Sequence, residues 1–511
     1  MTVRKSNVHN TLRLRRLGIE THQEAVVYMR DDCSVCRSEG FEAQSRVQVT
    51  VGERSIVATL NIVSTDLAMP CLLADGEVGL SEAAWKRLGA AEGKEAKFSH
   101  PPPVESLSYV RQKIYGGALD EAELLAVMQD VVDGRYADVH LASFLAACAG
   151  GRMTVNETVG LTRAMIEVGE TLRWEASPVV DKHCVGGLPG NRTTPIVVAI
   201  VAACGLVMPK TSSRAITSPA GTADTMETLA PVDLSLAQIR EVVGREGGCI
   251  VWGGSVRLSP ADDMLIRIER ALDLDSTSQL VASVLSKKAA AGSSHVVLDI
   301  PVGPTAKLRT RESADELEAM MEAVAEPIGL ELTVMHTDGR QPVGRGIGPA
   351  LEARDVLAVL QNKPDAPADL RERAGVLAGR LLEVAGVAEP ETGDQMADEV
   401  ITDGCAWQKF QAICEAQGGM RTPPTAPQQH EVAARSAGVV RSVDNRKLAR
   451  VAKLAGAPDA PAAGLEFLTP IGTCVERGQP LFTLHAETPG EMNYALEYVE
   501  QHPTIIELET T

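Results

Sequence analysis

The chain has 511 residues, a net charge of −19 and a hydrophobic content of 44%. This length exceeds one ordinary domain, and about three domains are expected. The acidic balance argues against a nucleic-acid polymer as partner, because such binding uses basic surface, but a small anionic substrate needs only a local positive pocket.

The N-terminal segment, residues 1–98, is predicted to form a small β-rich module. It opens with polar residues and lacks the pattern of a secretory signal. Short β-like runs then alternate with polar turns, at Leu12–Leu14, Ala25–Met29, Val47–Val51 and Ile56–Val63. The ten cysteines of the chain are scattered, which favours reduced thiols and a cytoplasmic protein.

Residues 99–177 are predicted to form a helical domain after a stiff proline hinge at 101–103. Apolar residues now recur at helical spacing, for example at Leu124, Val127, Met128 and Val131. Asp120 and Thr154 precede two of these stripes and suit helix caps. We expect antiparallel helices joined by short loops.

Residues 178–420 alternate strand-like and helical runs, which predicts a largely parallel sheet with ligands at the carboxyl ends of its strands. The longest apolar run, residues 195–207, is too short for a membrane span. A proline-rich linker follows at 421–430, and residues 431–511 are predicted to form a compact α/β module.

Two loops rich in glycine and hydroxyl groups are the strongest chemical signal. The first spans 179–194, the second spans 210–227, and both carry basic side chains. Glycines let backbone N–H groups approach an anion, and a following helix N-terminus adds partial positive charge. Together the loops predict a phosphate site with a second substrate beside it.

The amino-acid sequence of these loops resembles that of the thymidine phosphorylase family of nucleoside phosphorylases. The motif Val-Asp-Lys-His-x-x-Gly-Gly stands at 180–187, and Ser-x-Arg, six residues and Gly-Thr-x-Asp-x-x-Glu stand at 212–227. The resemblance covers about residues 105–500, and it is greatest for the branch of archaeal AMP phosphorylases and related bacterial proteins. It implies an α/β fold: a helical domain hinged to a larger α/β domain with a mostly parallel sheet, flanked by the N-terminal and C-terminal modules. Members are usually dimers through the helical domain.

The resemblance also implies roles for individual residues. Lys182 and His183 would flank the phosphate and the sugar, with His183 and Asp275 as catalytic residues and Asp275 as proton donor to the base. The phosphate would bind Lys182 and the hydroxyls of Thr193, Thr194, Ser212 and Thr222. Ser283 and Lys287 would lie at the base, on one helix face at i and i+4. The remaining nucleoside-binding or nucleotide-binding positions would be Gly187, Ser213, Arg214, Ala215, Ile216, Thr217, Ser218, Thr222 and Lys307.

Several of these residues also suit purely structural roles. Asp275 suits the N-cap of the helix that carries Ser283, and His183 suits a buried structural histidine. Lys287 and Lys288 suit a solvated helix end, and Lys307 suits an exposed surface position.

The sequence departs from the pyrimidine enzymes around the base. Cys184 and Val185 stand where those enzymes have Ser and Thr, and we expect Cys184 to be a packing residue. Ile268 stands where they have an arginine that reads the pyrimidine carbonyl. Lys307 replaces an aromatic or apolar residue and leaves room for a second phosphate.

The predicted reaction is phosphorolysis of the N-glycosidic bond of a nucleoside or nucleoside 5′-monophosphate. Inorganic phosphate and that substrate are the expected partners, with no metal or organic cofactor, no membrane and a homodimer or larger oligomer. The departures favour AMP or another ribonucleoside monophosphate, with thymidine as the alternative. A remote alternative is phosphoribosyl transfer, which would use diphosphate and Mg²⁺, with Asp224 and Glu227 as the candidate ligands; a binding protein with an inactive site is a third.

Overall fold

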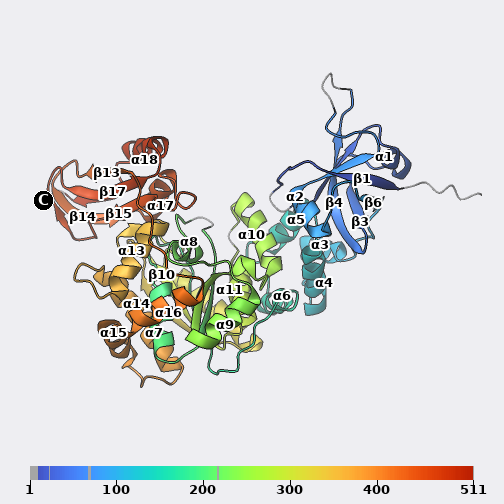
Figure 1. Ribbon diagram of the computed structural model, residues 1–511. Helices are drawn as coiled ribbons and strands as arrows, with labels where there is room; N and C mark the ends of the chain where they lie inside the picture. The colour runs from blue at the N-terminus through green and yellow to red at the C-terminus, as the bar shows by residue number, and fades with distance from the viewer. Residues whose placement is uncertain (1–9, 22–23, 67–70, 216–217, 275, 510–511) are drawn as a thin grey trace, which may run out of the picture. The chain divides into compact units, whose positions relative to one another are not determined.

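A computed structural model describes residues 10–21, 24–66, 71–215, 218–274 and 276–509. The chain divides into two compact units (Figure 1). The first comprises Met1–Cys148 and Met264–Leu274, and the second comprises Ala149–Asp263 and Asp275–Thr511. Among the helices of the described ranges, none combines the length and apolar character that a membrane span requires.

The first unit begins with a closed six-stranded barrel, drawn in blue in Figure 1. Its strands, in the order β1-β5-β2-β4-β3-β6 around the barrel, are β1 (Thr11–Arg16), β2 (Val26–Arg30), β3 (Arg46–Val51), β4 (Arg54–Val63), β5 (Glu77–Leu80) and β6 (Glu95–Ser99). Antiparallel pairing of Leu12 with Ala96 closes it. The predicted β-rich module is confirmed, and its short helices are α1 (Ser34–Glu39) and α2 (Glu82–Leu88).

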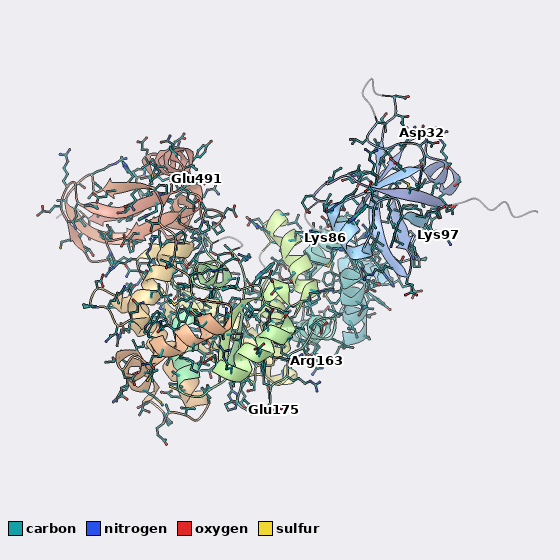
Figure 2. All side chains as sticks on the ribbon, viewed as in Figure 1. Asp32, Lys86, Lys97, Arg163, Glu175 and Glu491 are labelled. Atoms are coloured by element: carbon teal, nitrogen blue, oxygen red, sulfur yellow. The ribbon has the colours of Figure 1, made fainter. Side chains whose placement is uncertain are left out.

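Alternation of side chains fills the barrel. Along β6, Phe98 is fully buried in the barrel core, whereas Lys97 is exposed and lies on the outside (Figure 2). A strand with this two-residue period buries one face and solvates the other, so the pattern by itself specifies which way each residue faces.

The helices of the first unit follow the barrel. They are α3 (Leu107–Ile114), α4 (Glu121–Val132) and α5 (Asp138–Cys148), with the part of α10 (Pro260–Leu272) from Met264 onward. The predicted cap at Asp120 is confirmed: its side chain accepts from the backbone N–H of Glu123, whose carboxylate accepts from the N–H of Asp120. Arg267 of α10 donates two hydrogen bonds, of 2.8 and 2.5 Å, to Asp138 of α5, and so ties the returning helix to this unit.

The second unit is built on a parallel sheet, as predicted. Strands β11, β10 and β7 pair in that order, β8 pairs with β9, and a parallel bridge from Val179 to Val207 connects the two groups. These strands are β7 (Val180–Cys184), β8 (Met208–Ser212), β9 (Gly248–Trp252), β10 (His295–Val302) and β11 (Glu331–Asp338). All carboxyl ends therefore point to one edge of the sheet.

The most buried helix of this unit is α7 (Thr194–Ala203), in which Thr194 to Ala202 are all buried. It packs against α14 and α16, which explains why its sequence is apolar on every face. The remaining helices are α6 (Val155–Glu167), α8 (Thr222–Glu227), α9 (Leu236–Glu246), α11 (Thr277–Ala290), α12 (Arg311–Ala325), α13 (Pro349–Leu360), α14 (Ala368–Val384), α15 (Gly393–Thr402) and α16 (Cys405–Ala416). The predicted cap at Thr154 is confirmed by a capping box with Glu157.

The C-terminal part contains two antiparallel sheets and two helices. The four-stranded sheet runs β12 (Gly346–Ile347), β15 (Gly464–Phe467), β17 (Pro480–Ala486) and β13 (Gln428–Ala433). The three-stranded sheet runs β16 (Cys474–Val475), β14 (Gly438–Val443) and β18 (Ile506–Glu509), and the helices are α17 (Asn445–Leu454) and α18 (Pro489–Gln501). The predicted linker thus ends early, because residues 428–430 already pair with β17.

Candidate functional site

The two glycine-rich loops begin as neighbouring strands of the parallel sheet. Lys182 and Lys210 stand at the middle of β7 and β8, whereas His183 and Ser212 lie toward the carboxyl ends of these strands. This edge is where parallel α/β sheets bind ligands. Both strands extend into the loop motifs, as far as Cys184 and Ser212.

Asp181 holds two buried lysines. Its carboxylate oxygens lie 3.1 Å from the Lys210 ammonium and 2.8 Å from the Lys288 ammonium. Burial raises the pKa of Asp181, but the two ammonium groups outweigh burial, so the pKa lies below its usual value. Lys288, on α11, is 3% exposed, which rules out the solvated helix end that the sequence left open for it. Burial lowers the pKa of Lys288 to about 7.

The side chain of Lys182 is held by contacts with the start of α7 and with β10. Its ammonium donates a 2.7 Å hydrogen bond to the Thr193 hydroxyl and lies 4.0 Å from Asp299 of β10. Thr337 of β11 donates a 2.6 Å hydrogen bond to the same aspartate. Three buried lysines, Lys182, Lys210 and Lys288, thus share two buried aspartates, and the cluster carries an excess of positive charge while Lys288 is protonated.

Burial and this positive charge both act on the pKa of His183. Burial, together with the ammonium groups of Lys288, Lys210 and Lys182, holds the pKa of His183 well below its usual range, so the imidazole is neutral at pH 7. A dianion bound beside it would oppose these positive charges and raise the pKa of His183. Burial also raises the pKa of Cys184 to about 12, which keeps the thiol protonated and fits the expected packing role.

Donors for an anion surround the lysines. Thr193 is the N-cap of α7, the first N–H groups of which have no partner within the helix. Thr194 begins the same helix and is buried. The Ser212 hydroxyl is buried and has no hydrogen-bond partner among the described residues, although buried hydroxyls are nearly always satisfied.

The second loop is organised around an ion-pair network. Arg214 lies 2.6 Å from Glu227 and 3.1 Å from Asp224, and its guanidinium lies over the Trp252 ring at 5.0 Å. Asp224 also accepts from the backbone N–H groups of Ala215 and Gly221. The charge of Arg214 is therefore already matched by two carboxylates.

Thr222 is hydrogen-bonded to Arg192, which was not among the site residues predicted from the sequence. Its hydroxyl accepts a 2.7 Å hydrogen bond from Arg192, which also lies 2.7 Å from buried Glu352 of α13. Arg192 stands in the first loop beside Thr193, and this place next to a predicted phosphate-binding residue was the sequence signal that could have identified it. It joins the two loops, because it donates as well to the carbonyl of Ala220.

The other predicted positions lie on three elements. Ser283 and Lys287 occupy one face of α11, half-buried, and Lys287 lies 2.5 Å from Asp262. Gly187 has a φ of +83°, and a Cβ there would lie 2.2 Å from the backbone nitrogen of Lys307, so the first loop touches the segment that carries this lysine. Ser213 is exposed, and the Ser218 hydroxyl donates to the carbonyl of Ala220. Asp275, Ile216 and Thr217 lie outside the described residues.

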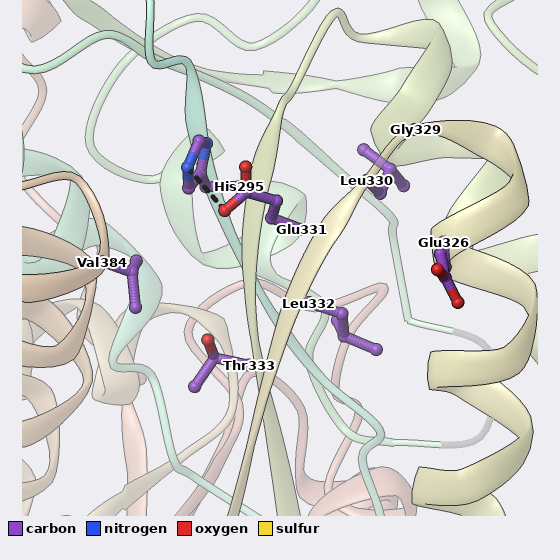
Figure 3. A pocket seen from close by; sticks show the side chains of 8 residues that line it. All are labelled: His295, Glu326, Gly329, Leu330, Glu331, Leu332, Thr333 and Val384. Carbon is purple, nitrogen blue, oxygen red and sulfur yellow. Dashed lines mark ion pairs between the residues drawn. The ribbon is translucent and has the colours of Figure 1, made fainter.

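A cavity of about 550 Å³ lies at the opposite edge of the sheet (Figure 3). His295 and Glu331, the first residues of β10 and β11, form a 3.1 Å ion pair at its wall, drawn as a dashed line in Figure 3. Amino ends of parallel strands rarely bind substrates, and none of the predicted site residues lines this cavity. We therefore place the candidate site at the carboxyl ends of β7 and β8.

Comparison with known families gives three matches in chain order. A glycosyl transferase family matches with its helical bundle domain at residues 107–169 and its a/b domain at 176–407. The pyrimidine nucleoside phosphorylase C-terminal domain matches residues 439–505. The barrel at the N-terminus precedes all three.

Two curated relatives match almost the whole chain. A protein named "Putative thymidine phosphorylase" from Polaromonas sp. (strain JS666 / ATCC BAA-500) is 63% identical over 95% of this chain and 94% of its own length. "Putative thymidine phosphorylase 2" from Acidovorax sp. (strain JS42) is 60% identical over 99% and 98% of the two chains. Among solved structures, anthranilate phosphoribosyltransferase from Thermus thermophilus aligns with a TM-score of 0.51 and 21% identity, covering 60% of this chain and 98% of that one, which shows a shared fold.

Proposed function

The chain belongs to the thymidine phosphorylase family, and from this premise we propose that it cleaves the N-glycosidic bond of a nucleoside with inorganic phosphate. The products are the free base and the pentose 1-phosphate. The single observation that carries the proposal is the cluster of Lys182 on β7, Lys210 on β8 and Lys288 on α11, three buried lysines that share two buried aspartates.

The cluster suits a phosphate nucleophile. Buried cations and the N-terminus of α7 would replace the water around the dianion, while the hydroxyls of Ser212, Thr193 and Thr222 would orient it. A phosphate oxygen forms a bond to C1′, the C1′–N bond breaks, and its electron pair leaves with the base. These groups are fixed before the substrate arrives, so little reorganisation accompanies the transition state.

The departing base needs a proton. We assign this task to His183: burial and the lysine ammonium groups lower its pKa, and a bound dianion would offset the contribution of the ammonium groups. Asp275 stays a second predicted donor. In either case the proton reaches the base nitrogen as the glycosidic bond breaks.

Thymidine is the substrate we propose first, since the relatives at about 60% identity carry the name of thymidine phosphorylases. The sequence-based preference for AMP finds no support in those names. A nucleoside 5′-monophosphate stays the second candidate on one observation, namely that the first glycine loop touches the backbone of Lys307. A homodimer is part of the same proposal.

Phosphoribosyl transfer is less well supported. The likeness to anthranilate phosphoribosyltransferase shows the fold alone. Asp224 and Glu227, the candidate Mg²⁺ ligands, both pair with Arg214, and Asp224 also accepts two backbone N–H groups. A metal ion would have to displace these contacts.

The test is a base-release assay on the whole protein with phosphate present or omitted. Thymidine, uridine, adenosine and AMP are compared by chromatography. We expect phosphate-dependent release of thymine from thymidine. Release from AMP but not from thymidine would replace the first substrate by the second, and release that needs diphosphate and Mg²⁺ instead of phosphate would contradict phosphorolysis.

A further inference from the structure

A second cluster of chemistry-bearing side chains lies away from the candidate site, between α12 and β11. Asp315 and Glu318 stand three residues apart on α12, and His336 stands on the strand that α12 covers. The carboxylate of Glu318 lies 2.8 Å from Nε2 of His336, and that of Asp315 lies 3.6 Å from Nδ1. One ligand atom from each residue can be chosen so that all lie within 4.8 Å of one another.

His336 is unusual for its surroundings. Two and four residues earlier on the same strand face, Val334 and Leu332 pack with Leu317 and Met321 of α12 in an apolar core. His336 is the next residue on this face, and it places an imidazole after two apolar side chains. Its side chain is 7% exposed, and its ring nitrogens face the carboxylates of Glu318 and Asp315 at 2.8 and 3.6 Å without hydrogen-bond geometry to either. An imidazole buried between two carboxylates calls for positive charge among the three groups, and a cation bound by all three would supply it.

We propose that Asp315, Glu318 and His336 form a binding site for a divalent transition-metal ion, with Zn²⁺ as the committed occupant. Imidazole favours Zn²⁺ over Mg²⁺ and Ca²⁺, and two carboxylates supply the balancing charge. The exposure falls from 55% at Asp315 through 31% at Glu318 to 7% at His336, so the ion can enter from solvent. Arg311 now pairs with Asp315 at 2.9 Å, and the ion would displace it.

The ligands come from two rigid elements, so the role of the ion is structural. It would fasten α12 to β11, an edge strand of the parallel sheet. The next residue, Thr337, donates to Asp299, which lies 4.0 Å from Lys182. The ion would therefore support the strand that positions part of the lysine cluster, without touching substrate.

The chain offers a matched control in His295. It also pairs with a glutamate, Glu331 at the start of β11, at 3.1 Å, but among the described residues it belongs to no cluster of three possible ligands. His295→Gln therefore removes a histidine–glutamate pair and leaves the proposed metal site intact.

The experiment titrates the full-length protein with ZnCl₂ by calorimetry in phosphate-free buffer. We expect one binding event that His295→Gln keeps and His336→Gln weakens at least about tenfold, the smallest loss seen when even outer-shell partners of a metal are removed. Zinc binding that is equal in wild type and His336→Gln would overturn the proposal, since cysteines would then be the ligands. Equal competition by Mg²⁺ would overturn it as well.

A second variant guards against a folding defect in His336→Gln. Asp315 is exposed, so Asp315→Asn should fold normally and still lower the zinc affinity several-fold. Zinc should also raise the melting temperature of the wild type and of His295→Gln, because a ligand that binds only the folded state stabilises it. An unchanged zinc response in Asp315→Asn and His336→Gln would contradict the site.

Discussion

The ammonium group of Lys288 lies 2.8 Å from the carboxylate of Asp181, and both side chains are almost fully buried. The carboxylate of Asp181 also lies 3.1 Å from the Lys210 ammonium, so one carboxylate forms ion pairs with two cations. Burial of this kind is costly unless a further anion completes the site. We therefore propose that the cluster binds a ligand that brings negative charge.

The first prediction concerns the charge of Lys288. Its pKa is lowered to about 7 by burial, so it loses its proton as the pH rises through that value. One positive charge then leaves the cluster, and anions should bind more weakly above pH 7. Sulfate is the suitable probe, because its own charge does not change in this range. The inhibition constant of sulfate against thymidine phosphorolysis should rise above pH 7 in the wild type. It should stay nearly level in Lys288→Met.

Lys287→Met is the control for that experiment. Lys287 is the neighbour of Lys288 but pairs with Asp262 instead of Asp181. The variant should keep the weakening of sulfate above pH 7. A wild-type inhibition constant that is independent of pH would remove Lys288 from the anion site.

Ser212→Ala tests the unsatisfied hydroxyl. Ser212 has no hydrogen-bond partner among the described residues, so its loss should hardly change the melting temperature. A hydrogen bond to a charged group is worth about 1.5–3 kcal/mol, so the phosphate affinity should fall by about tenfold or more. Ser293 is equally buried and equally unsatisfied in the described chain, but it precedes the amino end of β10. Ser293→Ala should leave phosphate binding unchanged; similar losses in both variants would contradict the role of Ser212.

His183 gives a pH dependence of stability. Its pKa in the folded protein lies well below 6.5, the value expected for the unfolded chain. The unfolded state therefore binds a proton first as the pH falls. The stability that a neutral His183 supplies is complete above pH 6.5 and declines below it, by at most about 1.4 kcal/mol per pH unit.

Urea unfolding at pH 7.5 and 5.5 measures this decline. The wild type should lose more stability between the two values than His183→Gln, since glutamine does not titrate. Saturating phosphate should narrow the difference, because a bound dianion raises the pKa of His183. A difference of zero between the two proteins without phosphate would contradict the depressed pKa.

The contact between the first loop and Lys307 is tested with two glycines that share a left-handed backbone. Gly186 has a φ of +89° and open space around a Cβ, whereas a Cβ at Gly187 would lie 2.2 Å from the Lys307 nitrogen. Both alanine variants bear the same backbone strain, but Gly187→Ala must also push the two segments apart. A displacement near 1 Å in an active site costs about 100-fold. We expect kcat/KM of Gly187→Ala to fall by about that factor relative to Gly186→Ala, and equal values would contradict the importance of the contact.

Local patterns in the sequence were enough for much of the fold and part of the site. Glycine spacing located both loops, and alternating strands and helices predicted the parallel sheet. The pairing of Leu12 with Ala96 that closes the barrel joins residues far apart in the chain, so no local pattern reveals it. Burial of Lys288 against Asp181 is likewise a tertiary contact. The pairing of Arg214 with Asp224 and Glu227 is also a contact that no local pattern reveals, since these partners stand 10 and 13 residues further along.

The most direct test of phosphorolysis follows the oxygen atoms. Thymidine is incubated with the protein and phosphate in which all four oxygens are ¹⁸O, and the product is read by ³¹P NMR and mass spectrometry. We predict 2-deoxyribose 1-phosphate that retains the full label, because a phosphate oxygen forms the new bond to C1′ and no P–O bond breaks. Free deoxyribose without a phosphate ester, or no thymine at all in the presence of phosphate, would contradict the account.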